Sequence, residues 1–250
     1  MLRVNNWASI VLAAGKGTRM KSELPKVMHK LLGRPMIFWV LELLRDVGIN
    51  RNIVVIGYKA DIVSEQLMGF SCQTVVQDEQ LGTGHAVMCT KSVLGRFDGN
   101  ILIICGDTPL FRRDTMHFFM KRHAESNSKL SVLTAVMKDA SGYGRIIHSH
   151  SDEDSICGIV EEKDASELEK DIREVNTGVY AINSAILFRL LDMVRPENAQ
   201  REYYLTDIVR FAVLHGEMFR AICCASSDEA LGVNSKDDLI KAEAIMSARC

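Results

Sequence analysis

Hydrophobic runs alternate with amphipathic stretches through the first half of this sequence. Short runs rich in β-branched residues predict buried strands, and apolar residues at helical spacing predict helices between them. This order of elements predicts right-handed βαβ units and a mostly parallel sheet. The expected strands cover residues 9–12, 52–56, 72–76, 101–105 and 130–137, and the expected helices cover residues 35–47, 61–67, 84–94 and 113–126.

The second half of the sequence follows a different pattern. Residues 145–148 and 158–162 have the pattern of paired strands on either side of a polar loop over 149–155. No internal repeat is detectable. The elements expected after this pair are a strand over 175–182, a helix that ends at Met193, a helix over 206–214, a strand over 219–224 and a last helix from about Asn234.

Composition limits the classes of protein to which this chain can belong. Its 250 residues carry a net charge of -2, and 25% of them are charged, as in an ordinary soluble domain. We expect no nucleic-acid partner, because binding of that kind depends on a basic field. We also expect no association with a membrane, because no segment is apolar for long enough to span a bilayer.

The cysteines favour a reducing compartment. There are seven, which is an odd number, and no two have the spacing of a CxxC motif. This pattern argues against a disulfide framework and against a zinc site. We therefore expect the protein to be cytoplasmic. The cysteines are Cys72, Cys89, Cys105, Cys157, Cys223, Cys224 and Cys250.

A glycine-rich loop follows the first expected strand. Small residues and glycines from Leu12 to Gly17 allow the backbone to approach a ligand closely, so that exposed amides can surround phosphate oxygens. Arg19 and Lys26 add two cations. The loop is not a dinucleotide fingerprint, since Met20 stands where the third glycine would be, and it lacks the spacing of a P-loop. The pattern indicates a polyphosphate-binding site.

This loop and the segment from Pro25 to His29 resemble the signature of sugar-1-phosphate nucleotidylyltransferases, in particular bacterial UDP-N-acetylglucosamine pyrophosphorylases. The resemblance covers essentially the whole chain. It implies an α/β, Rossmann-like nucleotidyltransferase fold, with a mixed, mostly parallel sheet in a single domain. Residues 1–110 would form a nucleotide-binding half and residues 111–250 a sugar-binding half. The resemblance also implies that Arg19 and Lys26 are catalytic and that the loop binds the nucleotide through Leu12, Ala13, Ala14, Gly15, Gly17 and Lys26.

A second motif, from Gln77 to Ala86, follows the third expected strand. An amide side chain both donates and accepts hydrogen bonds, so Gln77 is suited to the edge of a base. The segment resembles the uracil-recognition segment of the family, which implies that Gln77, Gly82 and Thr83 bind the base. The alternative is a polar turn that caps the following helix.

Two oxygen-bearing side chains are candidate metal ligands. Asp107 follows the strand over 101–105, and a carboxylate there, beside a polyphosphate, is a suitable ligand for Mg²⁺. The family's Gly-Asp-x-Pro pattern implies the same role for Asp107, and the resemblance implies that Asn234 is the second protein ligand. Two alternatives stay open. Asp107 could cap the turn that follows it, and Asn234 precedes Ser235 and Asp238, which approximate a capping box.

Three further residues form the sugar side of the site by resemblance. Gly144, Glu161 and Asn176 lie in segments that resemble those with which the family contacts the sugar. Alternation along a strand would place Glu161 and Glu162 on opposite faces, so only one of them can point into a cleft. Without the resemblance, this acidic segment is typical of a solvated face.

The resemblance implies a reaction and its substrates. UTP and N-acetylglucosamine 1-phosphate would give UDP-N-acetylglucosamine and pyrophosphate, by Mg²⁺-dependent in-line attack on the α-phosphate. Chemistry of this kind requires positioning and charge stabilisation and no covalent intermediate. The alternatives are a transferase for another base or sugar and a non-catalytic subunit that senses nucleotide sugars, because fold alone does not establish function.

Two features depart from the family pattern. Arg201 stands where the family usually has glycine, which leaves the conformation of that loop open. No hexapeptide β-helix repeat occurs before Cys250, whereas many members carry a C-terminal acetyltransferase β-helix. Either the protein is monofunctional or this chain is a fragment of a longer one. In both cases we expect uridylyl transfer without acetyl transfer from this chain, and a monomer or a weak homo-oligomer.

Overall fold

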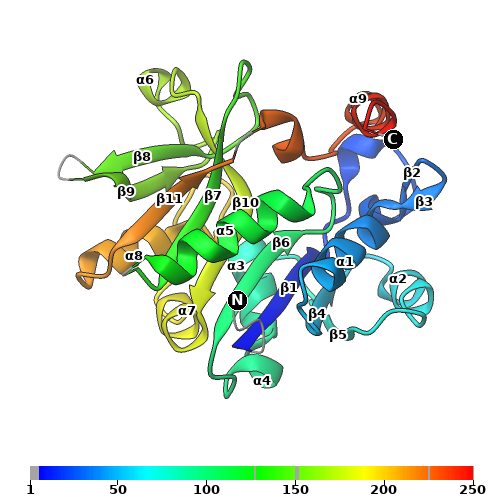
Figure 1. Ribbon diagram of the computed structural model, residues 1–250, viewed down its shortest axis with the longest axis horizontal. Helices are drawn as coiled ribbons and strands as arrows, with labels where there is room; N and C mark the ends of the chain where they lie inside the picture. The colour runs from blue at the N-terminus through cyan, green and yellow to red at the C-terminus, as the bar shows by residue number, and fades with distance from the viewer. Residues whose placement is uncertain (1–5, 127, 150–151, 225, 250) are drawn as a thin grey trace.

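A nine-stranded mixed sheet forms the centre of the computed structural model, which describes residues 6–126, 128–149, 152–224 and 226–249 (Figure 1). The order of its strands is β5-β4-β1-β6-β10-β7-β11-β9-β8. Among these strands, β9 and β10 run against the common direction. The strand bounds are β1 Trp7–Ala13, β4 Arg51–Ile56, β5 Gln73–Val76, β6 Asn100–Cys105, β7 Leu130–Val136, β8 Arg145–Ser149, β9 Asp152–Val160, β10 Glu174–Asn183 and β11 Phe219–Cys223.

Helices cover both faces of this sheet. In Figure 1, α1 and α5 lie across the face that is turned to the viewer. Within the described ranges, no helix has the length and apolar character needed to cross a membrane. The helix bounds are α1 Met36–Asp46, α2 Ala60–Gln66, α3 Thr83–Cys89, α4 Lys91–Leu94, α5 Arg113–Glu125, α6 Glu167–Lys170, α7 Ser184–Leu191, α8 Asp207–Leu214 and α9 Lys236–Ser247.

The alternation of side chains along each strand creates two hydrophobic cores, one on each face of the sheet. In β1, Val11 and Ala13 pack with side chains of α1 and α5. Ala8 and Ile10 of the same strand point the other way and pack with side chains of α3, α7 and α8. Because both faces are covered, the central strands are apolar along nearly their whole length. The predicted α/β layering is therefore confirmed.

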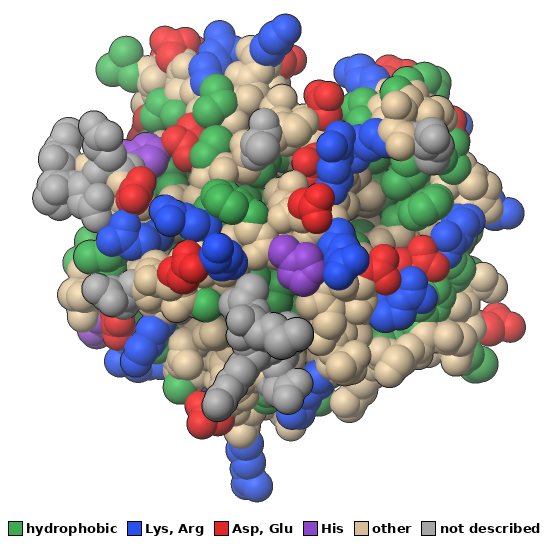
Figure 2. All heavy atoms as spheres, viewed as in Figure 1, with side chains coloured by type: hydrophobic (Ala, Val, Ile, Leu, Met, Phe, Trp, Pro, Cys, Tyr) green, Lys and Arg blue, Asp and Glu red, His purple; other side chains and the backbone are tan. Residues whose placement is uncertain are grey.

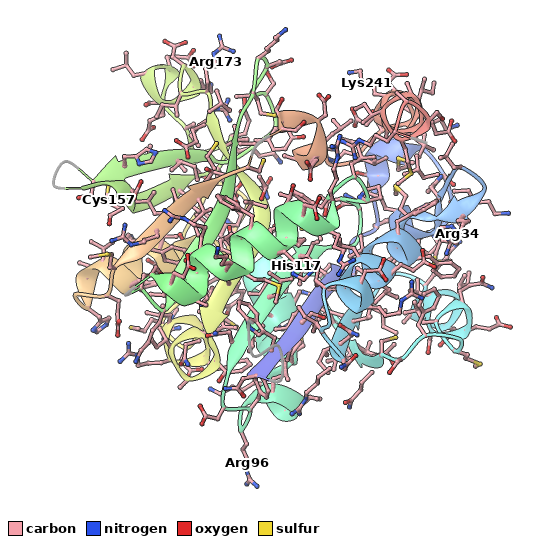
Figure 3. All side chains as sticks on the ribbon, in the orientation of Figure 1. Arg34, Arg96, His117, Cys157, Arg173 and Lys241 are labelled. Atoms are coloured by element: carbon pink, nitrogen blue, oxygen red, sulfur yellow. The ribbon has the colours of Figure 1, made fainter. Side chains whose placement is uncertain are left out.

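Charged side chains of both signs are interspersed over the face shown in Figure 2, which agrees with the small net charge of -2. Arg96, Arg173 and Lys241, which are labelled in Figure 3, project outward from the periphery of the molecule. Such exposed charges keep their hydration and contribute little to stability.

Two predicted elements differ from the structure. The single helix expected over 84–94 is divided into α3 and α4 at Thr90, whose buried hydroxyl donates to the Val87 carbonyl oxygen at 2.7 Å. The strand expected over 158–162 begins at Asp152 and ends at Val160, so most of the expected polar loop is strand. Residues 150 and 151 of that loop lie outside the described residues. Pairing of β9 with both β8 and β11 explains the longer strand.

Several short elements escaped prediction because they are too short to show a period. β2 (Lys30–Leu31) and β3 (Arg34–Pro35) form a small hairpin beside α9. α6 begins at a capping box of Ser166 and Glu169. The 3₁₀ segments are η2 Thr18–Met20, η3 Lys26–Met28 and η4 Ser227–Ala230.

One edge of the sheet gathers the loops that carry the predicted motifs. β1, β4, β5 and β6 are parallel, so their carboxyl ends lie at the same edge. β10 is antiparallel to β6, with Tyr180 opposite Ile103, so its first residues extend past the end of β6. Ligands of open α/β sheets bind at this kind of edge.

Candidate active site

A cleft at this edge has two adjoining compartments. The first, here called the loop compartment, has a lining that includes Ala13, Ala14, Gly15, Lys26, Gln77 and Gly82. The second, here called the strand compartment, has a lining that includes Arg19, Gly144, Glu161, Asn176 and Asn234. Leu12, Thr83, Cys105 and Asp107 line both compartments. The structure therefore brings together every predicted site residue except Gly17, which lines neither compartment.

Four polar side chains converge where the two compartments meet. The Lys26 ammonium is ion-paired with the Asp107 carboxylate and donates a hydrogen bond to Asn234 Oδ1 at 2.9 Å. The Arg19 guanidinium donates to the same oxygen at 2.8 Å. The side chains of Lys26 and Asp107 are 17% and 13% exposed. Two cations are thus held beside one carboxylate in a place partly shielded from water, where charges interact strongly.

Asn234 is available to this cluster because another residue caps the helix that follows it. Ser235 is the N-cap of α9, and its hydroxyl accepts a hydrogen bond from Asp238 N, while the Asp238 carboxylate accepts one from Ser235 N. The backbone N of Val233 donates to the Asp107 carbonyl oxygen at 2.9 Å, which ties this segment to the end of β6. Helix capping and the site therefore use different side chains.

Gly17 lets the Lys26 side chain pack closely against the glycine-rich loop. Its φ is +66°, and a Cβ at this position would lie 2.5 Å from Lys26 Cβ. Glycine therefore allows the stem of Lys26 to lie against the loop backbone in a left-handed conformation. Met20, which occupies the place of the missing third glycine, is fully buried and anchors η2.

A polar wall at the end of β5 closes one side of the loop compartment. Gln77 is buried, and its amide donates to the Gly82 carbonyl oxygen at 3.1 Å and lies 3.0 Å from His85 Nδ1. Gly82 has a φ of +111°, and a Cβ there would lie 2.7 Å from the Tyr203 carbonyl oxygen. Gly82 is also the N-cap of α3, so the segment both starts a helix and lines the compartment, together with Thr83.

Glu161 and Glu162 diverge after the end of β9. Glu161 lines the strand compartment, and its carboxylate accepts a hydrogen bond from the Thr206 hydroxyl at 3.0 Å. Glu162 instead forms an ion pair with the buried Arg145 at 2.8 Å. Burial raises the pKa of Glu161, and the hydrogen bond from Thr206 opposes this effect. The expectation that only one of these acids faces the cleft is confirmed.

A bulge in β10 forms part of the wall of the strand compartment. The register with β7 shifts between Asn176 and Val179, and Gly178 within the bulge has a φ of +78°. Asn176 Oδ1 accepts a hydrogen bond from Gly178 N at 2.9 Å, which fixes its side chain. A Cβ on Gly178 would lie 3.1 Å from Cys105 Sγ, so glycine permits the close approach of β10 to the end of β6.

The two side-chain oxygens at the junction are suitable ligands for a divalent cation whose other ligands would include substrate phosphate. The Lys26 ammonium contacts both the Asp107 carboxylate and Asn234 Oδ1, which shows that the two oxygens converge on one positive charge. Mg²⁺ prefers such hard oxygens and keeps water and substrate phosphates as its other ligands. No group of three or more His, Cys, Asp or Glu side chains within the described residues is placed to hold a metal by itself.

The fold and the cleft define the class of protein. Loop amides and two cations beside a polar wall suit a nucleotide, and an adjoining compartment with a buried carboxylate suits a second, hydroxyl-bearing substrate. The chain belongs to the nucleotidyl transferase family, whose profile matches residues 8–231.

Curated relatives are similar over nearly all of this chain. The bifunctional protein GlmU of Exiguobacterium sibiricum is 43% identical over 244 residues, which are 98% of this chain and 54% of that protein. The bifunctional protein GlmU of Syntrophotalea carbinolica is 42% identical over 242 residues, which are 97% of this chain and 52% of that protein. The chain thus spans about half the length of the curated relatives that it matches.

Solved structures confirm the predicted fold. A UDP-glucose pyrophosphorylase complexed with UDP-glucose superposes with a TM-score of 0.79 at 18% identity, over 97% of this chain and 99% of that chain. The apo form of UDP-glucose pyrophosphorylase gives the same TM-score at 19% identity, with the same coverage. At this level of identity the similarity concerns the fold alone.

Sequence reasoning did not single out Tyr180, Thr206 or Glu202, which also line the cleft. Tyr180 lies in an apolar strand, where the pattern predicts an ordinary core residue. Thr206 precedes α8, and a threonine there is typical of a helix N-cap. The contact that brings this segment to the cleft, from Leu205 N to Thr83 Oγ1 at 3.1 Å, joins residues that are 122 positions apart.

Proposed function

We propose that this protein transfers a uridylyl group from UTP to N-acetylglucosamine 1-phosphate, giving UDP-N-acetylglucosamine and pyrophosphate. A phosphate oxygen of the sugar phosphate attacks the α-phosphorus of UTP, and the bond from that phosphorus to the pyrophosphate oxygen breaks. The convergence of Arg19, Lys26, Asp107 and Asn234 at the junction of the two compartments carries the proposal. The phosphates of two substrates would have to meet at such a junction.

In this proposal UTP occupies the loop compartment. The glycine-rich loop surrounds its phosphates with backbone amides. The buried amide of Gln77 and the helix start beside it contact the uracil edge. The residues proposed to form the nucleotide site are Leu12, Ala13, Ala14, Gly15, Gly17, Lys26, Gln77, Gly82 and Thr83. Gly17 lines neither compartment and would act by supporting Lys26.

The sugar phosphate occupies the strand compartment. The Glu161 carboxylate and the Asn176 amide contact sugar hydroxyls, and Gly144 contributes its backbone. The hydrogen bond from Thr206 and the bulge in β10 hold these groups in place before the substrate binds. A site that is ordered in advance loses less entropy when it binds its substrate.

Charge stabilisation is the proposed source of catalysis. Lys26 lies at the junction, so its ammonium can contact both the α-phosphate and the attacking phosphate. Arg19 would stabilise the charge that develops on the departing pyrophosphate. A preorganised cation in a partly shielded site acts without reorganising at the moment of reaction.

Mg²⁺ is the proposed cofactor, with Asp107 and Asn234 as its protein ligands. Bound there, the ion would neutralise phosphate charge. The Lys26 ammonium contacts both oxygens, so binding of the ion would require Lys26 to exchange Asp107 for a substrate phosphate as its anionic partner.

We further propose that residues 1–110 form the nucleotide half of a single domain and residues 111–250 the sugar half. Asn234 of the second half hydrogen-bonds to Arg19 and Lys26 of the first, which supports joint action of the two halves. The cytoplasm is the proposed compartment, since all cysteines among the described residues are free thiols.

Pyrophosphate release tests this function. The assay combines UTP, Mg²⁺ and a panel of sugar 1-phosphates, and then exchanges UTP for CTP or GTP. We expect N-acetylglucosamine 1-phosphate and UTP to give the highest kcat/KM. CTP should be worse by roughly 5- to 150-fold, because an unpaired buried group costs about 1–3 kcal/mol. Equal rates with UTP and CTP would contradict the assignment of the base site, and inactivity with every sugar phosphate would contradict the function.

A further inference from the structure

The Tyr180 hydroxyl is a buried polar group without a hydrogen-bond partner. Tyr180 lies in β10, opposite Ile103 of β6 and Val132 of β7, and 1% of its surface is exposed. Its ring packs edge-on against Phe219, with 6.5 Å between the ring centroids. Its oxygen makes no hydrogen bond of ordinary geometry with any of the described residues, although the Asn176 side chain lies close enough to lower its pKa slightly.

Packing alone does not account for a tyrosine at this position. Removing a hydroxyl from water without replacing its hydrogen bond destabilises the folded state, whereas phenylalanine would fill the same space without that cost. Buried polar groups in proteins are nearly always satisfied, and the exceptions call for an explanation. A ligand that supplies the missing acceptor would be such an explanation.

Tyr180 belongs to the wall of the strand compartment, beside Glu161, Asn176 and Cys105. Burial raises the pKa of Tyr180 well above its usual value, and the nearby Glu161 raises it further, so the hydroxyl keeps its proton. Two neighbouring polar groups already have partners. The Thr206 hydroxyl donates to Glu161, and Asn176 Oδ1 accepts from the backbone of the bulge. Tyr180 therefore offers the compartment an unused donor.

Apolar surface accompanies this donor. Leu12 and Leu205 also line the strand compartment. The weakly polar side chain of Cys105 lines it as well. A donor beside apolar surface is complementary to an acetamido group, whose carbonyl oxygen accepts a hydrogen bond and whose methyl group is hydrophobic. A hydroxyl at the same place on a sugar would leave the apolar surface without a partner.

We infer that Tyr180 is a specificity-determining residue, which donates its hydroxyl hydrogen to the carbonyl oxygen of a 2-acetamido group on the sugar 1-phosphate. This inference rests on the proposed function, because it assumes that the strand compartment binds that substrate. It makes the site select an acetamido sugar over the same sugar with a hydroxyl at C2. The transfer chemistry itself does not depend on Tyr180.

The substitution Tyr180→Phe tests this role through the ratio of the kcat/KM values for two sugar phosphates. The kcat/KM values for N-acetylglucosamine 1-phosphate and for glucose 1-phosphate are measured at saturating UTP. We expect the preference of the parent protein for the acetamido sugar to fall about tenfold in the variant, as for the loss of one neutral hydrogen bond. The fall should arise from a higher KM for the acetamido substrate. The KM for UTP should stay the same, and the melting temperature should not decrease, because the unpaired hydroxyl adds no stability.

Tyr204→Phe is the matched control. The Tyr204 hydroxyl is also buried without a hydrogen bond of ordinary geometry, although it lies near the Asp164 carboxyl, and Tyr204 lines neither compartment. We expect this variant to keep the sugar preference of the parent. An unchanged preference in Tyr180→Phe, an equal loss for both sugars, or the same fall in Tyr204→Phe overturns the inference.

The failure of the proposed function would look different. In that case the parent protein would release no pyrophosphate with either sugar phosphate. Calorimetric binding of the two sugar phosphates to the parent and to Tyr180→Phe then tests the inference without turnover. Selective weakening of the acetamido ligand supports it, and identical affinities in the two proteins overturn it.

Discussion

Lys26 and Asp107 form an ion pair at the point where the two compartments of the cleft meet. The pair joins the segment after the glycine-rich loop to the end of β6, and Asn234 adds an oxygen from the start of α9. In this arrangement the Lys26 ammonium contacts two oxygens that we propose as ligands of Mg²⁺. The proposed reaction requires this lysine to exchange Asp107 for a substrate phosphate.

Asp107→Asn should raise the Mg²⁺ concentration needed for half-maximal activity by roughly tenfold or more, which corresponds to ~1.4 kcal/mol of lost cation binding. An amide oxygen is a weaker Mg²⁺ ligand than a carboxylate. Initial rates across a Mg²⁺ series measure the shift, and EDTA should abolish the activity of the parent. Asp46→Asn, an exposed acid paired with Arg45 outside the cleft, is the control. Full activity of the parent in EDTA would remove the metal from the mechanism.

Arg19→Ala should lower kcat by on the order of a hundredfold and change the affinity for UTP much less. Its proposed role is to stabilise charge that develops in the transition state, and the loss of one preorganised donor of this kind has that effect. Steady-state kinetics and a separate binding titration distinguish the two quantities. Arg113→Ala is the control, since Arg113 lies on α5 and donates to His117 of the same helix. Figure 3 labels His117. A fall in affinity with an unchanged kcat would make Arg19 a binding residue only.

Gly17→Ala should impair turnover through Lys26. Gly17 has a φ of +66° and a Cβ would lie 2.5 Å from Lys26 Cβ, so the lysine must be displaced. Gly33→Ala is a matched control, because Gly33 has a φ of +79° with nothing within 4 Å of the added Cβ. Both variants should lose about 1–2 kcal/mol of stability from left-handed strain. Only Gly17→Ala should lose activity, and equal activities of the two variants would show that the contact with Lys26 is unimportant.

Arg201→Gly should stabilise the protein. Arg201 adopts a φ of +55°, so the loop keeps the left-handed conformation that suits the glycine of the family pattern. Relief of this strain, partly offset by greater entropy of the unfolded chain, should raise the free energy of unfolding by up to about 1 kcal/mol. Denaturant titration measures the change. Arg201→Ala keeps the strain and should match the parent, so a glycine variant no more stable than the alanine variant would argue against strain at this position.

Glu161→Gln should stabilise the protein increasingly as the pH rises. Burial raises the pKa of Glu161, so the folded state binds this proton more tightly than the unfolded chain does. The stability contributed by the protonated form is complete below the ordinary pKa of about 4.5, and is lost as the pH rises through the raised pKa. Glutamine does not ionise and escapes this loss.

Thermal melts from pH 4 to pH 7 measure this effect. The difference in melting temperature between Glu161→Gln and the parent should be small at pH 4 and larger at pH 7. Glu65→Gln, an exposed site on α2, is the control and should give parallel curves. Parallel curves for Glu161→Gln would mean that its carboxyl is solvated in the folded protein.

The larger elements were predictable because their periodicity is a local property. The strands β1, β4, β5, β6 and β7 and the helices α1 and α5 follow directly from runs and spacings within about ten residues. β9 was predicted too short, because its first residues, such as Ser155 and Ile156, are held in the strand by pairing with Arg220 and Phe219 of β11. The split at Thr90 was missed because it interrupts no period in the sequence; in the structure the Thr90 hydroxyl donates to the Val87 carbonyl oxygen there.

The sequence by itself determined the chemistry that is available and its place along the chain. Glycines and cations follow the first strand, an amide follows the third, and an aspartate follows the strand over 101–105, so the parallel topology had to gather them at one edge. Only the tertiary structure decided which atoms meet. Lys26 and Asn234 are 208 positions apart, and no local pattern places them 2.9 Å from each other. The same holds for Tyr180. Its apolar strand predicts a core residue, and only the packing of β10 between β6 and β7 leaves its hydroxyl buried without a hydrogen-bond partner. Contacts of this kind depend on the joint packing of distant segments, whereas propensity and periodicity report on neighbours in the chain.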